Sequence, residues 1–309
     1  MELRHLRYII AVAEEGHITR AAERLGIAQP PLSRAIQEIE HRINLQLFRR
    51  MPRGVELTAA GRIFLDGARA TLANLDRTLE SAQRTARGEE GRISLGFTSS
   101  SAFHPLVPRV IREFRETFPR VTVRLVEESS SELIAHVKSD RIDAAFTRLI
   151  AVQHDGIDFH PFLEEPMVVA LPKSHELAQG KASVMIALKQ LSEESFVVNR
   201  QARQQPSGAG TRESFFAACH AAGFSPRVYQ EAPNVIATLP LIAAGIGISI
   251  LPSSLQHMNV AGVSFRRLAG NAPFKFSINL ASRSGDVSPV VRQFVNTVRR
   301  KAKDHLNQR

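Results

Sequence analysis

Residues 29–41 carry polar side chains at helical spacing that suits hydrogen bonding to DNA bases. Arg34, Gln37 and His41 follow one another at intervals of three and four, so they share one helical face, with Ser33 at its edge. Arginine, glutamine and serine read base edges in the major groove. We therefore expect a base-reading surface here. The alternative is an ordinary amphipathic helix whose polar face is only solvated.

Three further segments place hydroxyl groups and a cation where small anions are often bound. Residues 98–101 and 129–131 are runs of threonine and serine, and Arg148 ends the third segment. Each segment follows a predicted strand, so all three are expected at one edge of a parallel sheet, where α/β folds bind ligands. Such groups favour a carboxylate or another small anion. The alternative is that the serines only cap helices and that Arg148 pairs with Asp143 or Glu128 on the surface.

Two short helices joined by a tight turn must position the base-reading surface. We expect the first helix near residues 18–25, with Thr19 as its N-cap and Gly26 closing it. The second helix begins with Pro30 and Pro31, because the first helical turn does not need their missing N–H groups. Its buried face consists of apolar residues at intervals of four, three and four: Leu32, Ile36, Ile39 and Ile43.

The flanking segments complete a small domain. Residues 3–13 have the spacing of an amphipathic helix that finishes a three-helix core. Residues 48–58 contain a proline and a glycine between short extended runs, which is typical of a β-hairpin wing. Three arginines of this wing can reach phosphate or a minor groove: Arg49, Arg50 and Arg53. The order of these elements predicts a winged helix-turn-helix domain over residues 1–58.

A long helix is predicted next, over residues 59–87. Its apolar residues recur with the period of about 3.5 that is typical of a coiled-coil seam. They are Phe64, Ala68, Leu72, Leu75, Leu79, Ala82 and Ala86. This seam predicts a homodimer, in which two DNA-binding domains bind two half-sites together. The alternative is a helix packed on its own domain. Residues 88–91, Gly-Glu-Glu-Gly, end the helix and are expected to act as a hinge.

From residue 92 onward, predicted strands and helices alternate, as in parallel α/β sheets. The first set has three strands with helices between them, near residues 93–98, 121–126 and 142–146. A second set of the same kind begins near residue 167. A strand near residues 274–281 and a helix over residues 289–303 close the chain. Periodicity alone does not show which set they join.

Composition is compatible with a DNA-binding protein of two or three domains. The 309 residues include 40 Lys and Arg against 30 Asp and Glu, a formal charge of +10 that favours polyanion partners. Residues 1–58 hold nine arginines, no lysine and seven glutamates, so the pattern rather than the net charge identifies the DNA-binding domain. The N-terminus lacks the order of a signal peptide, and the longest apolar stretch is too short to span a bilayer. We expect a cytoplasmic protein that does not enter the membrane.

No catalytic constellation is visible in the sequence. The serine runs lack a GxSxG frame, and Gly245 and Gly247 are not followed by a full dinucleotide fingerprint. The single cysteine, Cys219, excludes an intramolecular disulfide, and the 11 histidines lack paired metal-ligand spacing. We therefore expect neither enzyme activity nor a metal or cofactor.

Four segments carry a family resemblance. They are the opening MELRHLRYIIAVAEEGHITRAAERLGIAQPPLSRAIQEIE, the exit from the wing ELTAAGRIFL, and the later segments RIDAAF and AAGIGISILP. On these residues the chain resembles a LysR-type transcriptional regulator, and the resemblance extends over essentially residues 1–300. It looks most similar to members of the family that control aromatic-acid catabolism.

The resemblance implies a fold and a set of domain boundaries. It implies an N-terminal winged helix-turn-helix domain, a long linker helix and a two-lobed α/β effector domain like that of periplasmic binding proteins. The expected boundaries are 1–58 for the DNA-binding domain, 59–87 for the linker, 88–91 for the hinge, 92–163 with 269–303 for lobe 1, and 164–268 for lobe 2. It also implies double-stranded promoter DNA as a partner, a homodimer through the linker helix, and a homotetramer.

Two groups of site residues are predicted. The DNA-binding residues are Gln29, Pro30, Ser33, Arg34 and Gln37 at base edges, with Arg50 and Arg53 on the flanking backbone. By resemblance, a small carboxylic acid, aromatic or unsaturated, is expected between the lobes as effector. Its expected contacts are Thr98, Ser99, Ser129, Arg148, Asn199 and Arg200. Its binding is expected to change the shape of the oligomer and the bending of promoter DNA. The sequence identifies neither the acid nor the operator, nor whether the effector activates or relieves repression.

Two other functions stay open from the sequence. A solute-binding or carrier protein would use only the two α/β lobes, and it leaves the first 91 residues without a purpose. A hydrolase or transferase in the cleft would turn over a candidate acid, whereas a regulator only binds it.

Overall fold

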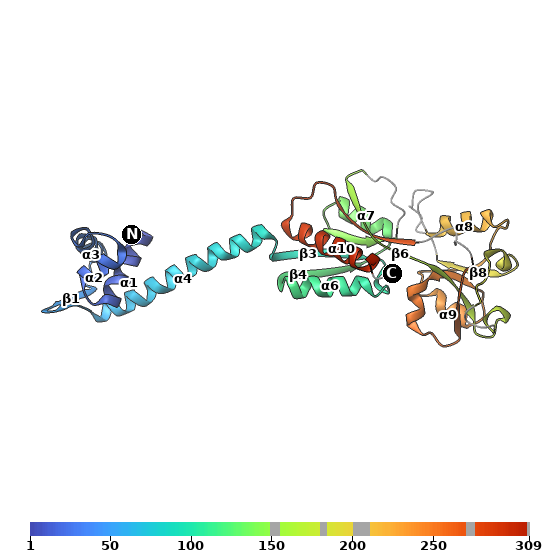
Figure 1. Ribbon diagram of the computed structural model, residues 1–309, viewed down its shortest axis with the longest axis horizontal. Helices are drawn as coiled ribbons and strands as arrows, with labels where there is room; N and C mark the ends of the chain where they lie inside the picture. Colours follow the sequence, from blue (N-terminus) through green and yellow to red (C-terminus); the bar gives the residue numbers. More distant parts are fainter. Residues whose placement is uncertain (149–154, 180–183, 200–210, 270–275, 308–309) are drawn as a thin grey trace. The chain divides into compact units, whose positions relative to one another are not determined.

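The computed structural model describes residues 1–148, 155–179, 184–199, 211–269 and 276–307. The chain divides into two compact units, Met1–Arg84 and Thr85–Arg309 (Figure 1). Within the described ranges, no helix is long and apolar enough to cross a membrane.

The first unit is a winged helix-turn-helix domain, as predicted. Its helices are α1 (Leu3–Glu15), α2 (Ile18–Leu25) and α3 (Gln29–Ile43). They pack around buried apolar side chains that include Ile9, Val12 and Leu32. The wing is an antiparallel hairpin of β1 (Phe48–Met51) and β2 (Gly54–Leu57).

Helix α2 ends at the glycine that the sequence predicts, but its N-cap is a different residue. Gly26 adopts the left-handed conformation, with φ 67°, and closes the helix. The prediction of Thr19 as N-cap is wrong. The N-cap is His17, whose Nδ1 accepts a hydrogen bond from the Thr19 backbone N–H at 3.2 Å. The helix begins at Ile18, which packs against the core, so the capping position moves to the residue before it.

The linker helix α4 (Ala59–Arg87) matches the predicted long helix. Thr58 caps it, because its Oγ1 accepts a hydrogen bond from the Gly61 N–H at 2.9 Å. Near its start the helix packs on its own domain, with Leu65 and Ala68 buried. Farther along the predicted seam, Leu72 and Leu75 are half-buried, and Leu79 is 53% exposed.

The second unit begins with a five-stranded sheet in the order β4-β3-β5-β12-β6. These strands are β3 (Glu90–Phe97), β4 (Arg120–Glu127), β5 (Ala144–Thr147), β6 (Ile157–Glu165) and β12 (Phe276–Arg283). β3 is parallel to β4 and β5, whereas β12 is antiparallel to β5 and β6. The helices on this sheet are α5 (Ser99–Ala102), α6 (Leu106–Thr117), α7 (Ser130–Lys138) and α10 (Pro289–Asn307).

Successive residues of β5 point to opposite faces of this sheet, and each face carries an apolar layer. Ala144 and Phe146 of β5 pack with α6 and α10, whereas Ala145 between them packs with α7. The sheet is therefore covered on both faces, as expected for an α/β lobe (Figure 1). The closing segments β12 and α10 return to this first lobe.

The second lobe differs from the predicted repeat of parallel strands. Its central strand β7 (Met167–Pro172) pairs antiparallel with both β10 (Ser249–Pro252) and β11 (Val263–Arg267). Among the described strands of this lobe, β8 (Ser195–Asn199) and β9 (Arg227–Ala232) form a parallel pair. The remaining elements are α8 (Thr211–Ala221), α9 (Thr238–Ala243) and the 3₁₀ turns η1 (Glu176–Ala178), η2 (Leu188–Leu191) and η3 (Ser253–Met258).

The segment between α4 and β3 is shorter than the predicted hinge. Strand β3 already includes Glu90 and Gly91, so Gly88 and Glu89 alone lie between the two elements. Gly88 is in the left-handed conformation, with φ 73°, and its backbone approaches that of Pro289 so closely that a side chain would not fit. The left-handed backbone conformation and the close approach to Pro289 therefore both explain why residue 88 is a glycine.

Candidate functional site

Helix α3 exposes the polar face that the sequence predicts. Gln29, Pro30, Arg34 and Gln37 are exposed, and Ser33 is half-buried. The opposite face is buried in the domain core through Leu32, Ile36 and Ile39. A helix held by one face and free on the other has the form that a major groove accepts.

The wing is attached firmly to the three-helix core. The Glu40 carboxylate, on α3, accepts hydrogen bonds from the backbone N–H groups of Leu47 and Phe48, at 2.7 and 2.9 Å. The Val55 N–H, on β2, donates to the Gly16 carbonyl at 2.9 Å. These bonds fix the wing relative to α3, so the two elements can contact DNA as one surface.

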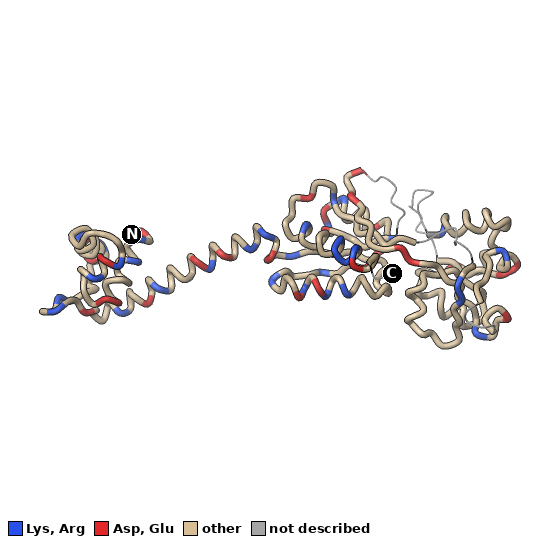
Figure 2. The backbone as a smooth tube through the Cα atoms, in the orientation of Figure 1, with Lys and Arg blue, Asp and Glu red and all other residues tan. Residues whose placement is uncertain are grey.

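The wing arginines differ in their surroundings. Arg49 pairs with Glu56 across the hairpin at 3.4 Å. Arg50 and Arg53 are exposed, and neither has an ion-pair partner in the described part of the chain. Figure 2 shows the basic positions gathered on this wing. Unpaired guanidinium groups are available to phosphate, which is the contact predicted for Arg50 and Arg53.

A pocket with a volume of about 70 Å³ lies between the two lobes of the second unit. Most of its lining is apolar, as is usual for small-molecule sites. The lining residues in the described ranges are Ser100, Arg148, Met167, Phe196, Val198, Asn199, Arg212, Phe215, Val235, Ser249, Ile250, Leu251, Pro252 and Phe276. Of the predicted effector residues, the pocket brings together Arg148 and Asn199. Arg200 lies outside the described residues.

The predicted hydroxyl residues near the strand ends do not line this pocket. Thr98 and Ser129 cap the short helices α5 and α7. The Ser99 hydroxyl donates to the Glu127 carboxylate at 2.6 Å. Ser129 donates to Glu132 from its hydroxyl and from its backbone N–H, and these bonds hold the pKa of Glu132 below its ordinary value. The protein's own carboxylates thus occupy the positions where an anionic ligand was expected.

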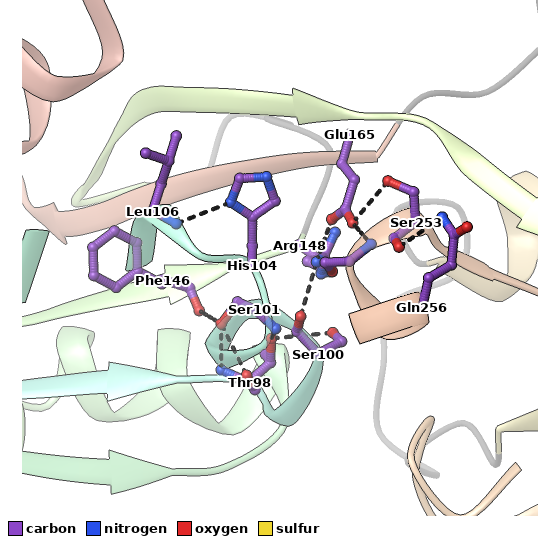
Figure 3. Close-up of polar contacts among 11 residues, drawn as sticks. Thr98, Ser100, Ser101, His104, Leu106, Phe146, Arg148, Glu165, Ser253 and Gln256 are labelled. Carbon is purple, nitrogen blue, oxygen red and sulfur yellow. Dashed lines mark hydrogen bonds and ion pairs between the residues drawn. The ribbon is translucent and has the colours of Figure 1, made fainter. Parts of the chain in front are cut away.

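Arg148 forms a buried ion pair that the sequence did not reveal. Its Nη2 donates to Glu165 Oε2 at 2.6 Å and to the Ser100 carbonyl at 2.9 Å (Figure 3). The two charged side chains are only 4% and 1% exposed. The surface pairing considered for Arg148, with Asp143 or Glu128, is therefore wrong.

Glu165 extends the ion pair to the second lobe. Its carboxylate also accepts hydrogen bonds from the Ser254 backbone N–H and the Ser253 hydroxyl, at the start of η3 (Figure 3). Burial acts to raise the pKa of Glu165, but the Arg148 charge and the bonds from Ser254 outweigh it and hold the pKa below its ordinary value. Burial lowers the pKa of Arg148, although Glu165 opposes that shift. Both groups remain charged at neutral pH, because arginine keeps its proton in proteins.

Part of the Arg148 guanidinium is left without a partner. Its Nε and Nη1 are buried and make no hydrogen bond to any described residue. A buried unpaired N–H is destabilising, so each such group needs a structural or functional explanation. These two donors and the position of Arg148 on the pocket make this pocket the candidate binding site.

Sequence reasoning missed one charged residue of the pocket, Arg212. It lies in the first turn of α8, where its Nη1 pairs with Glu231 Oε1 at 2.6 Å. Its guanidinium also lies 5.4 Å from the centre of the Phe216 ring. No signal in the sequence indicates that this end of the helix contributes to the pocket.

Neither a metal site nor a reactive thiol is found in the described chain. No group of three His, Cys, Asp or Glu side chains is close enough there to hold a metal ion. Cys219 is buried in the second lobe, and burial raises the pKa of its thiol to about 12. The thiol therefore stays protonated and unreactive at neutral pH.

Two family descriptions match the chain. "Bacterial regulatory helix-turn-helix protein, lysR family" matches residues 3–62, and "LysR substrate binding domain" matches residues 86–303. The regulator AlsR of Bacillus subtilis (strain 168) is 36% identical over 296 residues, covering 96% of this chain and 95% of AlsR. BudR of Raoultella terrigena is also 36% identical over 296 residues, covering 96% of this chain and 99% of BudR.

A solved structure shares the whole architecture. Full-length CbnR complexed with its target DNA is 30% identical and superposes with a TM-score of 0.83. The match covers 98% of this chain and 100% of that chain.

Proposed function

This chain belongs to the LysR family of DNA-binding transcriptional regulators with an effector-binding domain, and from that premise we propose what its effector is and how it acts. The effector is a small carboxylic acid with an aromatic or unsaturated body, bound between the two lobes. Its binding changes the shape of the oligomer and the bending of promoter DNA. The protein acts in the cytoplasm, where its promoter DNA lies.

The observation that carries this proposal is the unpaired edge of Arg148. Arg148, whose Nε and Nη1 are buried without a hydrogen-bond partner among the described residues, lines a pocket whose other walls are mainly apolar. Such a pocket favours a ligand with oxygen acceptors at one end and an apolar body. Asn199 adds an amide from lobe 2. The sequence also predicts contacts from Thr98, Ser99, Ser129 and Arg200. These contacts require the lobes to move on binding.

The ion pair of Arg148 and Glu165 suggests how binding is transmitted. Arg148 directly follows strand β5 of lobe 1, and its partner Glu165 accepts a hydrogen bond from the Ser254 N–H in η3 of lobe 2. A ligand that reorients Arg148 therefore changes a contact between the lobes. A ligand shifts a conformational equilibrium only through different affinities for the two states, and couplings of about 1–3 kcal/mol are typical.

DNA recognition is proposed to divide between α3 and the wing. Gln29, Pro30, Ser33, Arg34 and Gln37 approach base edges in the major groove. Arg50 and Arg53 bind the flanking backbone.

Two chains are proposed to pair through the linker helix. The exposed apolar side chains around Leu79 support this seam. The proposed boundaries are those predicted from the sequence, except that the hinge is Gly88 and Glu89 and the first lobe extends to Glu165. Two dimers are proposed to form a tetramer.

Replacing Arg148 tests its role in ligand binding directly. In titration calorimetry with 4-hydroxybenzoate and with 4-oxopentanoate, Arg148→Ala should weaken the binding of whichever acid binds the wild type by about tenfold or more, because it removes donors to an oxygen acceptor of the ligand. Arg227→Ala is the matched control, since Arg227 is exposed and forms only a surface ion pair with Glu193. If Arg148→Ala is folded and its affinity for the acid is unchanged, the proposed role of Arg148 in binding is contradicted.

A further inference from the structure

The pocket has two charged lining residues in the described chain, and both are arginines. Arg148 comes from lobe 1 and Arg212 from lobe 2. Each is paired with a glutamate outside the lining, Glu165 and Glu231 respectively. The two ion pairs differ in burial, and this difference decides which arginine can bind an acid group.

Arg148 is poorly suited to bind a carboxylate. Its partner Glu165 is 1% exposed and also accepts the Ser254 N–H, so it cannot leave without breaking a second buried bond. A ligand carboxylate would then add a second buried negative charge beside one guanidinium, which desolvation makes unfavourable. The free Nε–H and Nη1–H groups of Arg148 instead suit a neutral oxygen acceptor, which satisfies buried donors without adding charge.

Arg212 can exchange its partner. Glu231 is 43% exposed and Arg212 is 24% exposed, so water can hydrate the Glu231 carboxylate once the pair opens. Ion pairs of this kind contribute little to stability. The Phe216 ring, 5.4 Å away, helps to hold the Arg212 guanidinium at the pocket whether or not Glu231 is bound. With Glu231 turned to solvent, Arg212 carries the net positive charge of the site.

We propose that the effector is a monocarboxylic acid that carries a second, neutral oxygen, as in a keto or hydroxy acid. Its carboxylate replaces Glu231 on Arg212 in lobe 2, and its carbonyl or hydroxyl oxygen accepts from Arg148 in lobe 1. This inference rests on the acid effector proposed above and adds the residue that recognises the acid group. A ligand held in this way bridges the two lobes and favours one arrangement of them.

Titration calorimetry of the full-length protein with two matched sets of acids tests the charge assignment. The sets are pentanoate, 4-oxopentanoate and glutarate, and benzoate, 4-hydroxybenzoate and terephthalate. In at least one set, the keto or hydroxy acid should bind about tenfold more tightly than the plain monoacid, because it satisfies the two donors of Arg148. It should also bind more tightly than the diacid, whose second charge is uncompensated. Preference for the diacid would overturn the inference.

Variants of the Arg212 pair test which residue recognises the acid. Arg212→Gln should lower the affinity for the preferred acid by about tenfold, and Arg212→Lys should restore part of that loss. Glu231→Gln should strengthen binding by up to about fivefold, because it removes the internal competitor. Arg227→Gln, which removes an exposed arginine of the same lobe, should leave affinity unchanged.

The outcomes separate this inference from the effector role itself. If acids bind but Arg212→Gln leaves their affinity unchanged, or Glu231→Gln weakens them, Arg212 is not the acid receptor, and the acid effector still stands. If none of the six acids binds the wild type, the acid effector is contradicted and this inference falls with it.

Discussion

Arg34 and Arg50 are both exposed arginines of the DNA-binding domain, yet they are predicted to contribute differently. Arg34 lies on the groove-facing side of α3, so Arg34→Ala should cost about 1–3 kcal/mol on the operator and relax base preference there. Arg50 lies on the wing, so Arg50→Ala should weaken binding to all sequences and flatten the salt dependence. Binding measured on operator and random DNA across a salt series distinguishes them. An equal loss for Arg34→Ala on both DNAs would contradict its base-reading role.

The surroundings of His160 predict how the stability of the effector domain depends on pH. The Arg299 Nη2 donates to its Nδ1 at 3.1 Å, and its Nε2 is 3.0 Å from the Ser282 hydroxyl, so the ring is held neutral. Burial and the Arg299 charge lower the pKa of His160, although Asp158 opposes them. The unfolded chain therefore takes up a proton more readily, and this contribution to stability is lost as pH falls below the ordinary value of 6.5.

Melting temperatures between about pH 7.5 and pH 5.5 check this sign. The effector domain of the wild type should become less stable as the pH falls. His160→Gln cannot take up a proton at this position, so its stability should change less over the same range. An equal or steeper loss in His160→Gln would show that the histidine does not contribute.

Residue-level contacts were the part of the site that the sequence revealed least. Arg148 was predicted as a pocket cation because it follows a strand, and that local signal was sufficient. Its partner Glu165 was not predicted, because the pair joins two strands of a sheet and no spacing rule relates them. Arg212 was missed for the same reason, since its position on the pocket depends on how the second lobe folds.

Among the elements, the linker helix makes a prediction about assembly. Leu79 is exposed on the predicted seam, so Leu79→Asp should separate the dimer while leaving each chain folded. Ala70→Asp introduces the same side chain on the opposite face of the helix and is the matched control. Sedimentation velocity should show smaller particles for Leu79→Asp alone. Dimers of unchanged stability in Leu79→Asp would mean that the seam lies elsewhere.

Helices were predicted more fully than strands. The helix-turn-helix follows from signals within a few residues, such as Gly26 and the prolines at the start of α3. Strand β6 was not predicted, and Pro161 within it is normally a sign against a strand. The structure accommodates this proline because β6 is an edge strand and pairs with β12 through a register shift beside Asn279.

The second lobe shows where alternation of strands and helices misleads. Its pattern resembles that of the first lobe, but β7 lies between two antiparallel partners. Local periodicity carries no information about strand direction, which depends on pairing between distant segments. The return of β12 and α10 to the first lobe was expected from the family resemblance, because it too is invisible to periodicity.

At the scale of the whole molecule, the chain joins a surface for DNA to a pocket for a small molecule. The DNA surface belongs to the first compact unit of the chain, whose helix-turn-helix and wing follow one another in the sequence. The pocket lies between two lobes that are connected by a buried ion pair as well as by the chain. A pocket of this kind can report the presence of a ligand only if the ligand prefers one arrangement of the lobes.

A DNase footprint on the region upstream of the protein's own gene tests this account most directly. At about 0.1 M salt the protein should protect an extended region, with half-sites separated by whole helical turns. Adding an acid that binds the pocket should change the protection pattern, because the bound effector is proposed to alter DNA bending. Absence of protection at micromolar protein would contradict the DNA-binding role. A footprint that no bound acid alters would contradict the coupling of pocket to DNA.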